Sequence, residues 1–177
     1  MLTQEQLKEL FYYHPESGDF VRLTRPASKS LVGHLVGTKV GHGYFKISIN
    51  YRGYYAHRLA WLYVHGVFPP ADTDHINGDR GDNRIKNLRA ATRRENTHNS
   101  KARSDNAAGY KGVSRHRPTG KWRAVIHDNG KQVSLGLFPS PQAASQAYRN
   151  AASELHGEFL YTGETLEDRD TRFKPQE

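Results

Sequence analysis

The sequence of 177 residues has no cysteine and no long apolar run, and these two absences exclude several classes of protein. Without cysteine the chain forms neither disulfides nor zinc sites with cysteine ligands. No apolar stretch approaches the roughly 20 residues that a membrane-spanning helix requires. The opening stretch, MLTQEQLKEL, also lacks the apolar segment of a signal peptide. We therefore expect a cytoplasmic protein that does not bind a membrane.

Acidic residues are few beside the basic ones. The chain has 18 Asp and Glu against 26 Lys and Arg, which gives a formal net charge of +8 at pH 7. Residues 1–108 and 109–161 are both net positive, and only residues 162–177 are net negative. Such a charge favours nucleic acid as a partner, although a solvated basic surface without any partner would give the same count.

Local signals in the first hundred residues predict short helices and strands. Two capping boxes, Thr3 with Gln6 and Thr92 with Glu95, each mark the start of a helix. Alternating apolar and polar residues in YFKISINYRGYYAH indicate strands, and Gly66 ends an apolar helical stretch. The expected elements are a helix within residues 3–12, strands within 19–56, a buried helix at 57–66 and a helix from Arg93 to about Ser100.

A second unit is expected after an aperiodic linker at residues 101–108. The stretch GYKGVSRHRPTGKWRAVIHDNGKQVSLGLF contains three short strands separated by turns. The clearest helix of the chain follows, with Ser140 as N-cap, Pro141 in the first position and Gly157 at the end. Its Ala-rich stripe must be buried, and the preceding sheet is the nearest surface.

The stretch TDHINGDRGDNRIKNL, residues 73–88, crowds Asp, His and Asn together and has three possible interpretations. A calcium loop starting at Asp72 fails, because Ile76 would stand at the fifth position and Asn83 at the twelfth, where Glu is needed. A structural zinc site without cysteine needs several His, and the region offers only His75 and, further on, His98. A nuclease centre explains more of the pattern.

Hydrolysis of a phosphodiester requires a metal ion to neutralise charge and a base to deprotonate the attacking water. Asp74 is a hard oxygen ligand suited to Mg²⁺ or Mn²⁺, and His75 titrates in the range of a base. Asn87 could fix the tautomer of His75, and Asn96 could offer the ion another oxygen. Consecutive residues of a regular strand face opposite ways. The strand must therefore end or bend at Asp74 and His75, or the scissile phosphate must lie between them.

The stretch DHINGDRGDNRIKNLRAATRRENTHNS, with AHRLAWLYVHG upstream, resembles the HNH endonucleases of phages, including homing-type members. The resemblance implies two short strands and a helix around one divalent ion. It implies Asp74 as metal ligand, His75 as general base and Asn87 as the residue that orients the base. Asn96 matches the third family position and His98 is the alternative. On an ideal helix these two side chains point about 200° apart, and we favour Asn96.

Other polar residues near the motif have structural interpretations. We interpret His57 as structural, and Asp79, Asp82 and Asn83 as the turn before Asn87. Asn83 could also hold a phosphate or a water molecule of the metal.

Residues 109–161 resemble the AP2 domain through the stretches GKWRAVI, LGLF, AASQAYRNAA and HGEF. The resemblance implies a three-stranded antiparallel sheet that lies in the DNA major groove and packs on one helix. Strand alternation predicts that Trp122, Ala124 and Ile126 face this helix. Arg can read guanine edges and Lys more often contacts phosphate. We expect the DNA-binding residues to be Lys111, Arg115, Arg117, Lys121, Arg123 and His127, with Arg115, Arg117, Lys121 and Arg123 on one exposed surface.

The predicted fold class is α+β, a ββα-metal (HNH) nuclease module followed by an AP2 domain. The predicted segments are a β-rich region with short helices (1–70), the HNH motif (71–100), a linker (101–108), the AP2-like domain (109–161) and a charged tail (162–177). The expected function is a monomeric endonuclease that uses Mg²⁺ or Mn²⁺ to nick or cut double-stranded DNA at a preferred site inside the host cell of a phage. The alternative is a sequence-specific DNA-binding regulator with a non-catalytic HNH scaffold.

Overall fold

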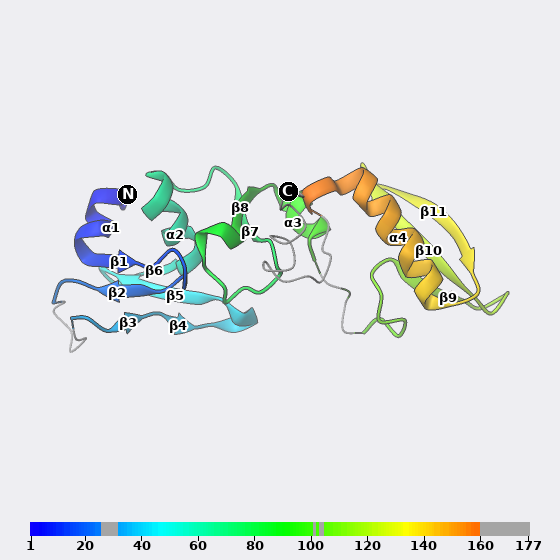
Figure 1. Cartoon of the computed structure of the whole chain (residues 1–177), viewed down its shortest axis with the longest axis horizontal. Helices are drawn as coiled ribbons and strands as arrows, with labels where there is room; N and C mark the ends of the chain where they lie inside the picture. The colour runs from blue at the N-terminus through cyan, green and yellow to red at the C-terminus, as the bar shows by residue number, and fades with distance from the viewer. Residues whose placement is uncertain (26–31, 101, 103–104, 160–177) are drawn as a thin grey trace, which may run out of the picture. The chain divides into compact units, whose positions relative to one another are not determined.

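The computed structural model describes residues 1–25, 32–100, 102 and 105–159. The chain forms two compact units, which divide between Asn96 and Thr97 (Figure 1). Each unit mixes helices with small antiparallel sheets, as the sequence predicts. The predicted tail, 162–177, lies outside the described residues.

Ten of the described helices and strands lead up to the helix at the division between the units. They are α1 (Gln4–Leu10), β1 (Phe11–Tyr13), β2 (Phe20–Arg22), β3 (Leu35–Val36), β4 (Thr38–Lys39), β5 (Phe45–Ile49), β6 (Arg52–Tyr55), α2 (Ala56–His65), β7 (Asp72–His75) and β8 (Leu88–Ala91), and the helix that follows them is α3 (Arg93–His98). Short 3₁₀ turns lie at Gly41–Gly43 and Ile85–Asn87. The strands form three sheets with the orders β1-β2-β3, β4-β5-β6 and β7-β8.

Both predicted capping boxes are present. The Thr3 hydroxyl accepts the Gln6 N–H at 3.3 Å, and the Gln6 side chain accepts the Thr3 N–H at 3.1 Å. Thr92 and Glu95 exchange the same pair of bonds at 3.3 and 2.7 Å. The predicted helix after Thr92 is confirmed, although α3 ends at His98, short of the expected Ser100.

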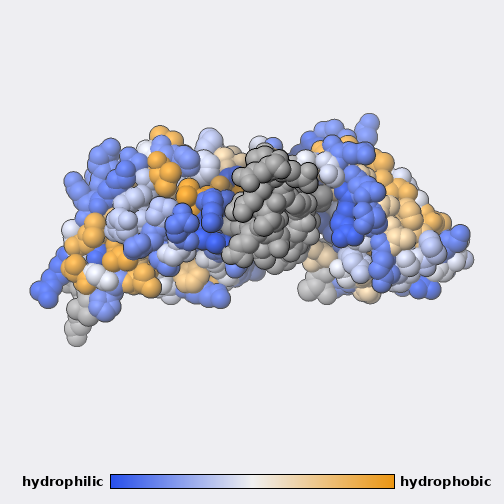
Figure 2. Space-filling model, in the orientation of Figure 1, coloured by the Kyte–Doolittle hydropathy of each residue, from blue (hydrophilic) through white to orange (hydrophobic). Residues whose placement is uncertain are grey.

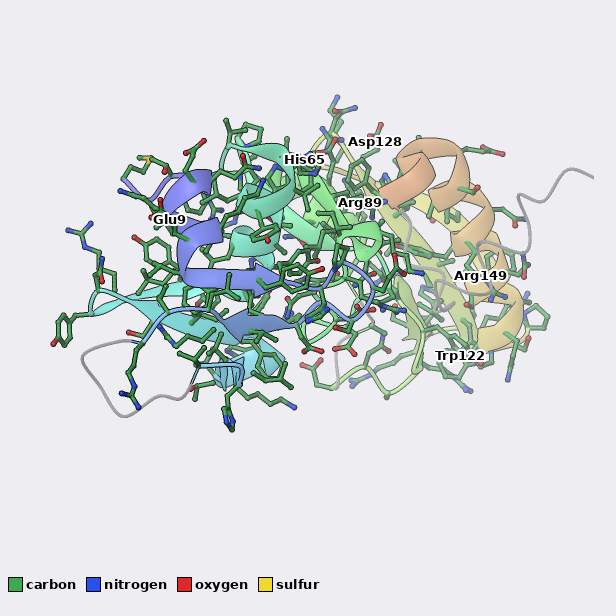
Figure 3. All side chains as sticks on the ribbon, turned by 60° about the vertical axis from the view of Figure 1, so that its left-hand side comes forward. Glu9, His65, Arg89, Trp122, Asp128 and Arg149 are labelled. Carbon is green, nitrogen blue, oxygen red and sulfur yellow. The ribbon has the colours of Figure 1, made fainter. Side chains whose placement is uncertain are left out.

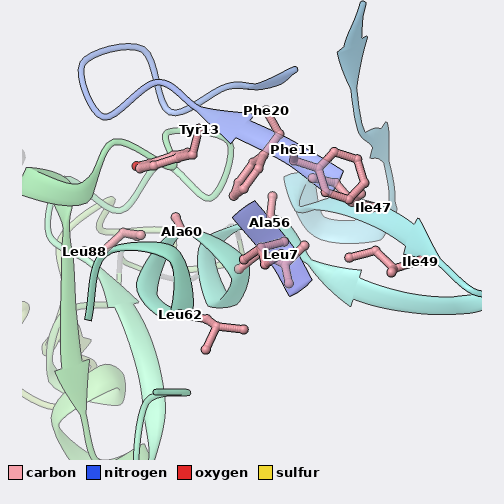
Figure 4. Packing of buried hydrophobic residues seen from close by; sticks show 11 residues of the cluster. Leu7, Phe11, Tyr13, Phe20, Ile47, Ile49, Ala56, Ala60, Leu62 and Leu88 are labelled. Atoms are coloured by element: carbon pink, nitrogen blue, oxygen red, sulfur yellow. The ribbon is translucent and has the colours of Figure 1, made fainter. Parts of the chain in front are cut away.

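Aromatic side chains dominate the core of the first unit. Phe11 and Phe20 of β1 and β2 meet edge to face, with ring centroids 6.4 Å apart. Tyr13 lies 4.8 Å from Phe20. Figure 4 shows these rings beside Leu7 of α1 and Ala60 of α2. The two helices and the first sheet are thereby fixed to one another by large buried apolar surfaces.

The turn between β5 and β6 has an unusual side chain at its tip. Asn50 and Tyr51 have φ values of 48° and 64°, the left-handed pair that a two-residue hairpin turn requires. Tyr51 is fully exposed there.

The second unit is a three-stranded sheet packed on one helix. Its elements are β9 (Val113–His116), β10 (Lys121–Asp128), β11 (Lys131–Phe138), α4 (Pro141–His156) and a 3₁₀ turn at Gly157–Phe159, and the strand order is β11-β10-β9. Ala124 and Ile126 of β10 are buried with Ala144 and Ala152 of α4. The predicted face of β10 towards the helix is therefore confirmed, and Ser140 caps α4 as expected, accepting the Ala143 N–H at 3.1 Å.

Gly112 lies where the backbone before β9 comes close to Tyr148 of α4. Its φ is +72°, and a Cβ atom there would lie 2.3 Å from the Tyr148 ring and 2.5 Å from the Val125 oxygen. The Gly112 carbonyl accepts the Val125 N–H at 2.9 Å. Only glycine meets both the conformational and the steric demand of this position.

Hydrophilic residues cover much of the visible surface of both units, with apolar patches among them (Figure 2). Within the described residues, no helix has both the length and the apolar character needed to cross a membrane.

Candidate functional site

The strands β7 and β8 carry the first half of the predicted nuclease centre. Their antiparallel register places Asp74 opposite Arg89 and His75 opposite Leu88. Strand β7 ends at His75, whose carbonyl accepts the Gly78 N–H at 2.8 Å in the following turn. Both residues thus lie within the regular strand, which ends only after His75, and alternation turns their side chains to opposite faces.

Asp74 is buried in an ion pair across the two strands. Its exposed fraction is 3%, and its Oδ2 accepts hydrogen bonds from Arg89 Nε at 2.8 Å and Nη2 at 2.7 Å. Arg89 belongs to β8 and is labelled in Figure 3. Hydrogen bonds between a guanidinium and a carboxylate are charge-assisted and therefore stronger than neutral ones. Arg89 was not among the predicted site residues, although pairing the DTDH and LRAA stretches as strands would have placed it opposite Asp74.

His75 lies among polar and aromatic neighbours that differ from those of Asp74. Its Nε2 is 3.5 Å from Asn83 Oδ1, and its ring centroid is 5.1 Å from that of His57 and 6.0 Å from that of Tyr44. Burial lowers the pKa of His75 below its ordinary value, although the bond to Asn83 and the Asp74 charge oppose the shift. A neutral imidazole near pH 7 is the form that can accept a proton.

His57, at the start of α2, is closer to the candidate base than a purely structural interpretation suggests. Its ring stacks on Tyr55 at 5.4 Å and meets His75 edge to face. Burial lowers the pKa of His57 to about 3. Its Nδ1 is buried and has no hydrogen-bond partner among the described residues. The AHRLAW stretch contains His57 and was the only sequence signal for it. The contact between His57 and His75 joins two elements 18 residues apart, so the stretch alone does not reveal it.

Asn87 is completely buried below the loop that follows β7. Its Oδ1 accepts the Asn77 N–H at 3.0 Å, and its Nδ2 donates to the Asp82 carbonyl at 2.8 Å. Both bonds fix the loop rather than the imidazole, and the amide oxygen beside His75 Nε2 is that of Asn83. The role of Asn87 in orienting the base stays a prediction.

The loop before Asn87 is held by bonds within it and by residues outside it. Asp82 accepts two hydrogen bonds from the Arg84 guanidinium, at 2.8 and 2.7 Å. The Tyr13 hydroxyl donates to the Asn83 carbonyl at 2.7 Å. A Cβ atom on Gly18 would lie 2.6 Å from the Arg84 nitrogen. Residues from the N-terminal β-hairpin therefore support the backbone that carries Asn83, and the predicted turn at this place is confirmed.

The two alternatives for the third site position lie in α3, on either side of the division between the units. The Asn96 N–H donates to the Thr92 carbonyl at 3.0 Å, as part of the helix. The His98 ring stacks on His156 of α4, with centroids 3.6 Å apart.

Lys111 binds the end of this helix. Its Nζ donates to the carbonyl oxygens of Thr97, His98 and Ser100 at 3.0, 2.8 and 2.9 Å. A lysine is well suited to the unpaired carbonyls at a helix C-terminus. Burial lowers the pKa of Lys111 to about 8. The sequence predicted Lys111 as a DNA contact and gave no sign of this role. In the structure its ammonium binds the carbonyls at the end of α3.

The metal donors that the sequence proposes are oxygen atoms, on Asp74 and Asn96. Among the described residues, no group of three or more His, Cys, Asp and Glu side chains is placed to hold an ion. Mg²⁺ needs few protein ligands, since it keeps several waters and commonly binds one or two carboxylates together with substrate phosphates. The buried, charged carboxylate of Asp74 fits such an ion.

The outer face of the AP2-like sheet carries only part of the expected basic set. Lys121, Arg123 and His127 are exposed and alternate with the residues that face α4. Arg115 pairs with Trp122 in the register, and paired residues share a face. The Arg115 guanidinium lies 5.1 Å from the Trp122 ring, on the helix side of the sheet. The prediction that Arg115 shares one surface with Lys121 and Arg123 is therefore wrong, because alternation from buried Val113 turns Arg115 towards the helix side.

Comparisons with known proteins agree with this division of the chain. A family model described as HNH endonuclease matches residues 54–98, and one described as AP2 domain matches residues 108–158. Protein 3.8 of Escherichia phage T7 is 32% identical over 104 residues, which cover 58% of this chain and 85% of that protein. An uncharacterized HNH endonuclease of Acanthamoeba polyphaga mimivirus is 31% identical over 105 residues, covering 58% of this chain and 54% of its own.

Plant proteins match the second unit alone. The APETALA2-like protein 2 of Oryza sativa subsp. indica is 48% identical over 48 residues, which are 27% of this chain and 11% of the plant protein. No solved structure matches the chain.

Proposed function

Because this chain belongs to the HNH endonuclease family and carries an AP2 domain after the nuclease motif, we propose that it is a metal-dependent, homing-type endonuclease that cuts duplex DNA. In this proposal the HNH module cuts, and the AP2 domain directs it to a preferred site. The observation that carries the proposal is the buried pair at the end of β7. There a charged carboxylate and a neutral imidazole occupy consecutive positions.

His75 acts as the general base in this mechanism. It takes a proton from the water that attacks phosphorus, and Asn83 Oδ1 and the His57 ring limit how the imidazole can turn. Asp74 and Asn96 would hold Mg²⁺ or Mn²⁺, which when bound stabilises negative charge on the departing 3′ oxygen. Asn96 is preferred to His98, because the His98 ring already stacks on His156.

The AP2 domain contacts DNA through the exposed face of its sheet. Lys121, Arg123 and His127 lie on this face, and Arg117 is exposed in the turn before β10. Arg123 has the geometry to read a guanine edge, whereas Lys121 suits a phosphate. Arg115, beside Trp122, contacts DNA from the edge of this face. Lys111 is not included among the DNA contacts, because it binds the end of α3.

A plasmid assay tests the nuclease function. The purified chain is incubated with supercoiled DNA in Mg²⁺, in Mn²⁺ and in EDTA, beside His75→Ala. We expect open-circular product that requires the metal and falls by at least about 100-fold in His75→Ala, since general bases contribute factors of this size. DNA affinity in EDTA should remain unchanged in the variant. His65→Ala, which alters an exposed histidine at the end of α2, is the matched control and should cut normally.

Three other outcomes have distinct meanings. Normal cutting by His75→Ala would contradict the assignment of the base. Linear plasmid that forms without earlier open-circular product would show that both strands are cut together. That outcome would indicate two cooperating copies of the chain rather than a monomer that nicks. Tight binding without any cutting by the natural chain would favour a DNA-binding regulator.

A further inference from the structure

A long part of the first unit contains no acidic residue. Between Phe20 and Ala71 the sequence has no Asp or Glu, whereas the average of the chain would put about five in a stretch of this length. The same stretch carries seven cations, which are Arg22, Arg25, Lys29, Lys39, Lys46, Arg52 and Arg58. Apart from residues 54–71, this stretch precedes the match to the HNH family, so the nuclease motif does not explain it.

The described cations of this stretch are not neutralised within the fold. Among the described residues, no ion pair involves Arg22, Arg25, Lys39, Lys46, Arg52 or Arg58. Arg22 and Lys46 lie over aromatic rings instead, at 4.7 Å from the Phe11 centroid and 4.6 Å from the Tyr55 centroid. Their positive charge is therefore available to an external anion.

Two of these cations line one cavity. It has a volume of about 430 Å³ and lies between β2–β3 and β4–β5, where Arg22, His34 and Lys46 line it together with the hydroxyls of Thr38 and Ser48. No acidic residue takes part in the lining. Arg22 Nε is buried and has no hydrogen-bond partner among the described residues. Because a buried donor without an acceptor is unfavourable, this atom indicates a ligand with acceptor oxygens.

We propose that this cavity binds a backbone phosphate of duplex DNA and that the β2–β6 region is a further DNA-binding surface of the chain. Duplex DNA is favoured over a single small anion because the stretch from Phe20 to Ala71 has no acidic residue, so a polyanion meets no like charge along it. The choice of DNA among polyanions rests on the proposed nuclease function. The surface recognises no sequence, because phosphate contacts fix position and register without reading bases.

The test measures DNA binding without cutting. A fluorescent 30-base-pair duplex, a length chosen for the assay, is titrated with the full chain in EDTA at several salt concentrations, and anisotropy gives Kd. Each lost phosphate contact should reduce the slope of log K against log salt by about 0.9. We expect this reduction in Lys46→Gln and in Arg22→Gln, with Kd weakened equally for unrelated sequences.

Lys8→Gln is the matched control. Lys8 is exposed on α1 of the same unit and also lies over a tyrosine ring, at 5.3 Å from Tyr63, but outside the acid-free stretch. It should leave the slope unchanged although it removes the same charge. An unchanged slope in Lys46→Gln, or an equal reduction in Lys8→Gln, would overturn the proposal. Arg22→Gln also removes a contact with buried Phe11, so Lys46→Gln decides if Arg22→Gln unfolds.

Failure of this proposal is distinguishable from failure of the nuclease. With Mg²⁺ and saturating plasmid, Lys46→Gln should cut at the natural rate while the DNA concentration for half-maximal rate rises. A chain that never cuts would still give the salt slopes, since those are measured in EDTA.

Discussion

The two units hold their functional surfaces in different ways. In the first, the loop beside His75 is fixed by amide and carboxylate side chains, of which Asn87 is completely buried. In the second, the outer sheet is fixed from behind by small residues, with Ala124 and Ala144 buried and Gly112 against Tyr148. Polar bonds prescribe directions, whereas close packing prescribes volumes. The loop beside His75, where side-chain geometry must be exact, is thus held by directional hydrogen bonds. The sheet of the second unit, which presents a surface, is held by close packing.

Gly112→Ala should have the largest effect, because it violates both backbone conformation and volume in the second unit. The new Cβ would lie 2.3 Å from Tyr148 at a φ of +72°, and we expect a loss of about 3–5 kcal/mol in the unfolding free energy of that unit. Chemical denaturation with hydrogen exchange should show β9–β11 losing protection while β7 and β8 keep it. Plasmid cutting should persist with weaker site preference.

Gly130→Ala is the control for this prediction. It has a similar φ of +77° but nothing within 4 Å of the added atom. It should lose only about 1 kcal/mol, the cost of a left-handed alanine. Equal losses in the two variants would show that packing against Tyr148 is unimportant.

Asn87→Ala should have the next largest effect, this time in the first unit. It leaves the Asn77 N–H and the Asp82 carbonyl without their partner, and we expect a loss of about 2–4 kcal/mol. Hydrogen exchange should rise in residues 77–84 and stay unchanged in β9–β11. Combined with Gly112→Ala, the two losses should add, because the sites belong to separate units. Strong non-additivity would contradict the separation of the two kinds of support.

The smallest effect concerns the charge state of the buried ring beside His75. The pKa of His57 is about 3 in the folded chain, against an ordinary value of 6.5. Below about pH 6.5 the unfolded chain therefore binds a proton at His57 that the folded chain does not bind. The unfolding free energy should therefore fall as pH decreases from 6.5 towards 3. His57→Phe should reduce this fall by about 1.4 kcal/mol per pH unit between pH 5.5 and 4.5. Denaturation at pH 7.5 gives the baseline, and parallel curves for the two proteins would contradict the prediction.

Local signals account for most of what the sequence predicted correctly. The Thr3 and Thr92 capping boxes, the Gly66 helix end and the Ser140 cap each depend on a few neighbouring residues, and each is present. The face of β10 towards α4 followed from alternation alone.

Contacts between distant residues were the part that the sequence could not supply. The His57 contact with His75 joins separate elements, so no spacing rule indicates it. The Arg89 bond to Asp74 follows only once the DTDH and LRAA stretches are paired as strands. Lys111 was counted as a DNA contact because its charge was visible and the carbonyls at the end of α3 were not. The predicted surface of Arg115 was wrong for a local reason, since alternation from Val113 already placed Arg115 on the helix side.

The turn at Asn50 and Tyr51 gives this chain a use in spectroscopy. Because the sequence has no cysteine, Tyr51→Cys would create a single thiol, fully exposed, at a position where one L side chain already accepts a φ of 64°. A fluorophore attached there would leave both units otherwise unlabelled. Energy transfer to a dye on one end of a duplex would then report, on single molecules, when DNA arrives at this hairpin and how long it stays.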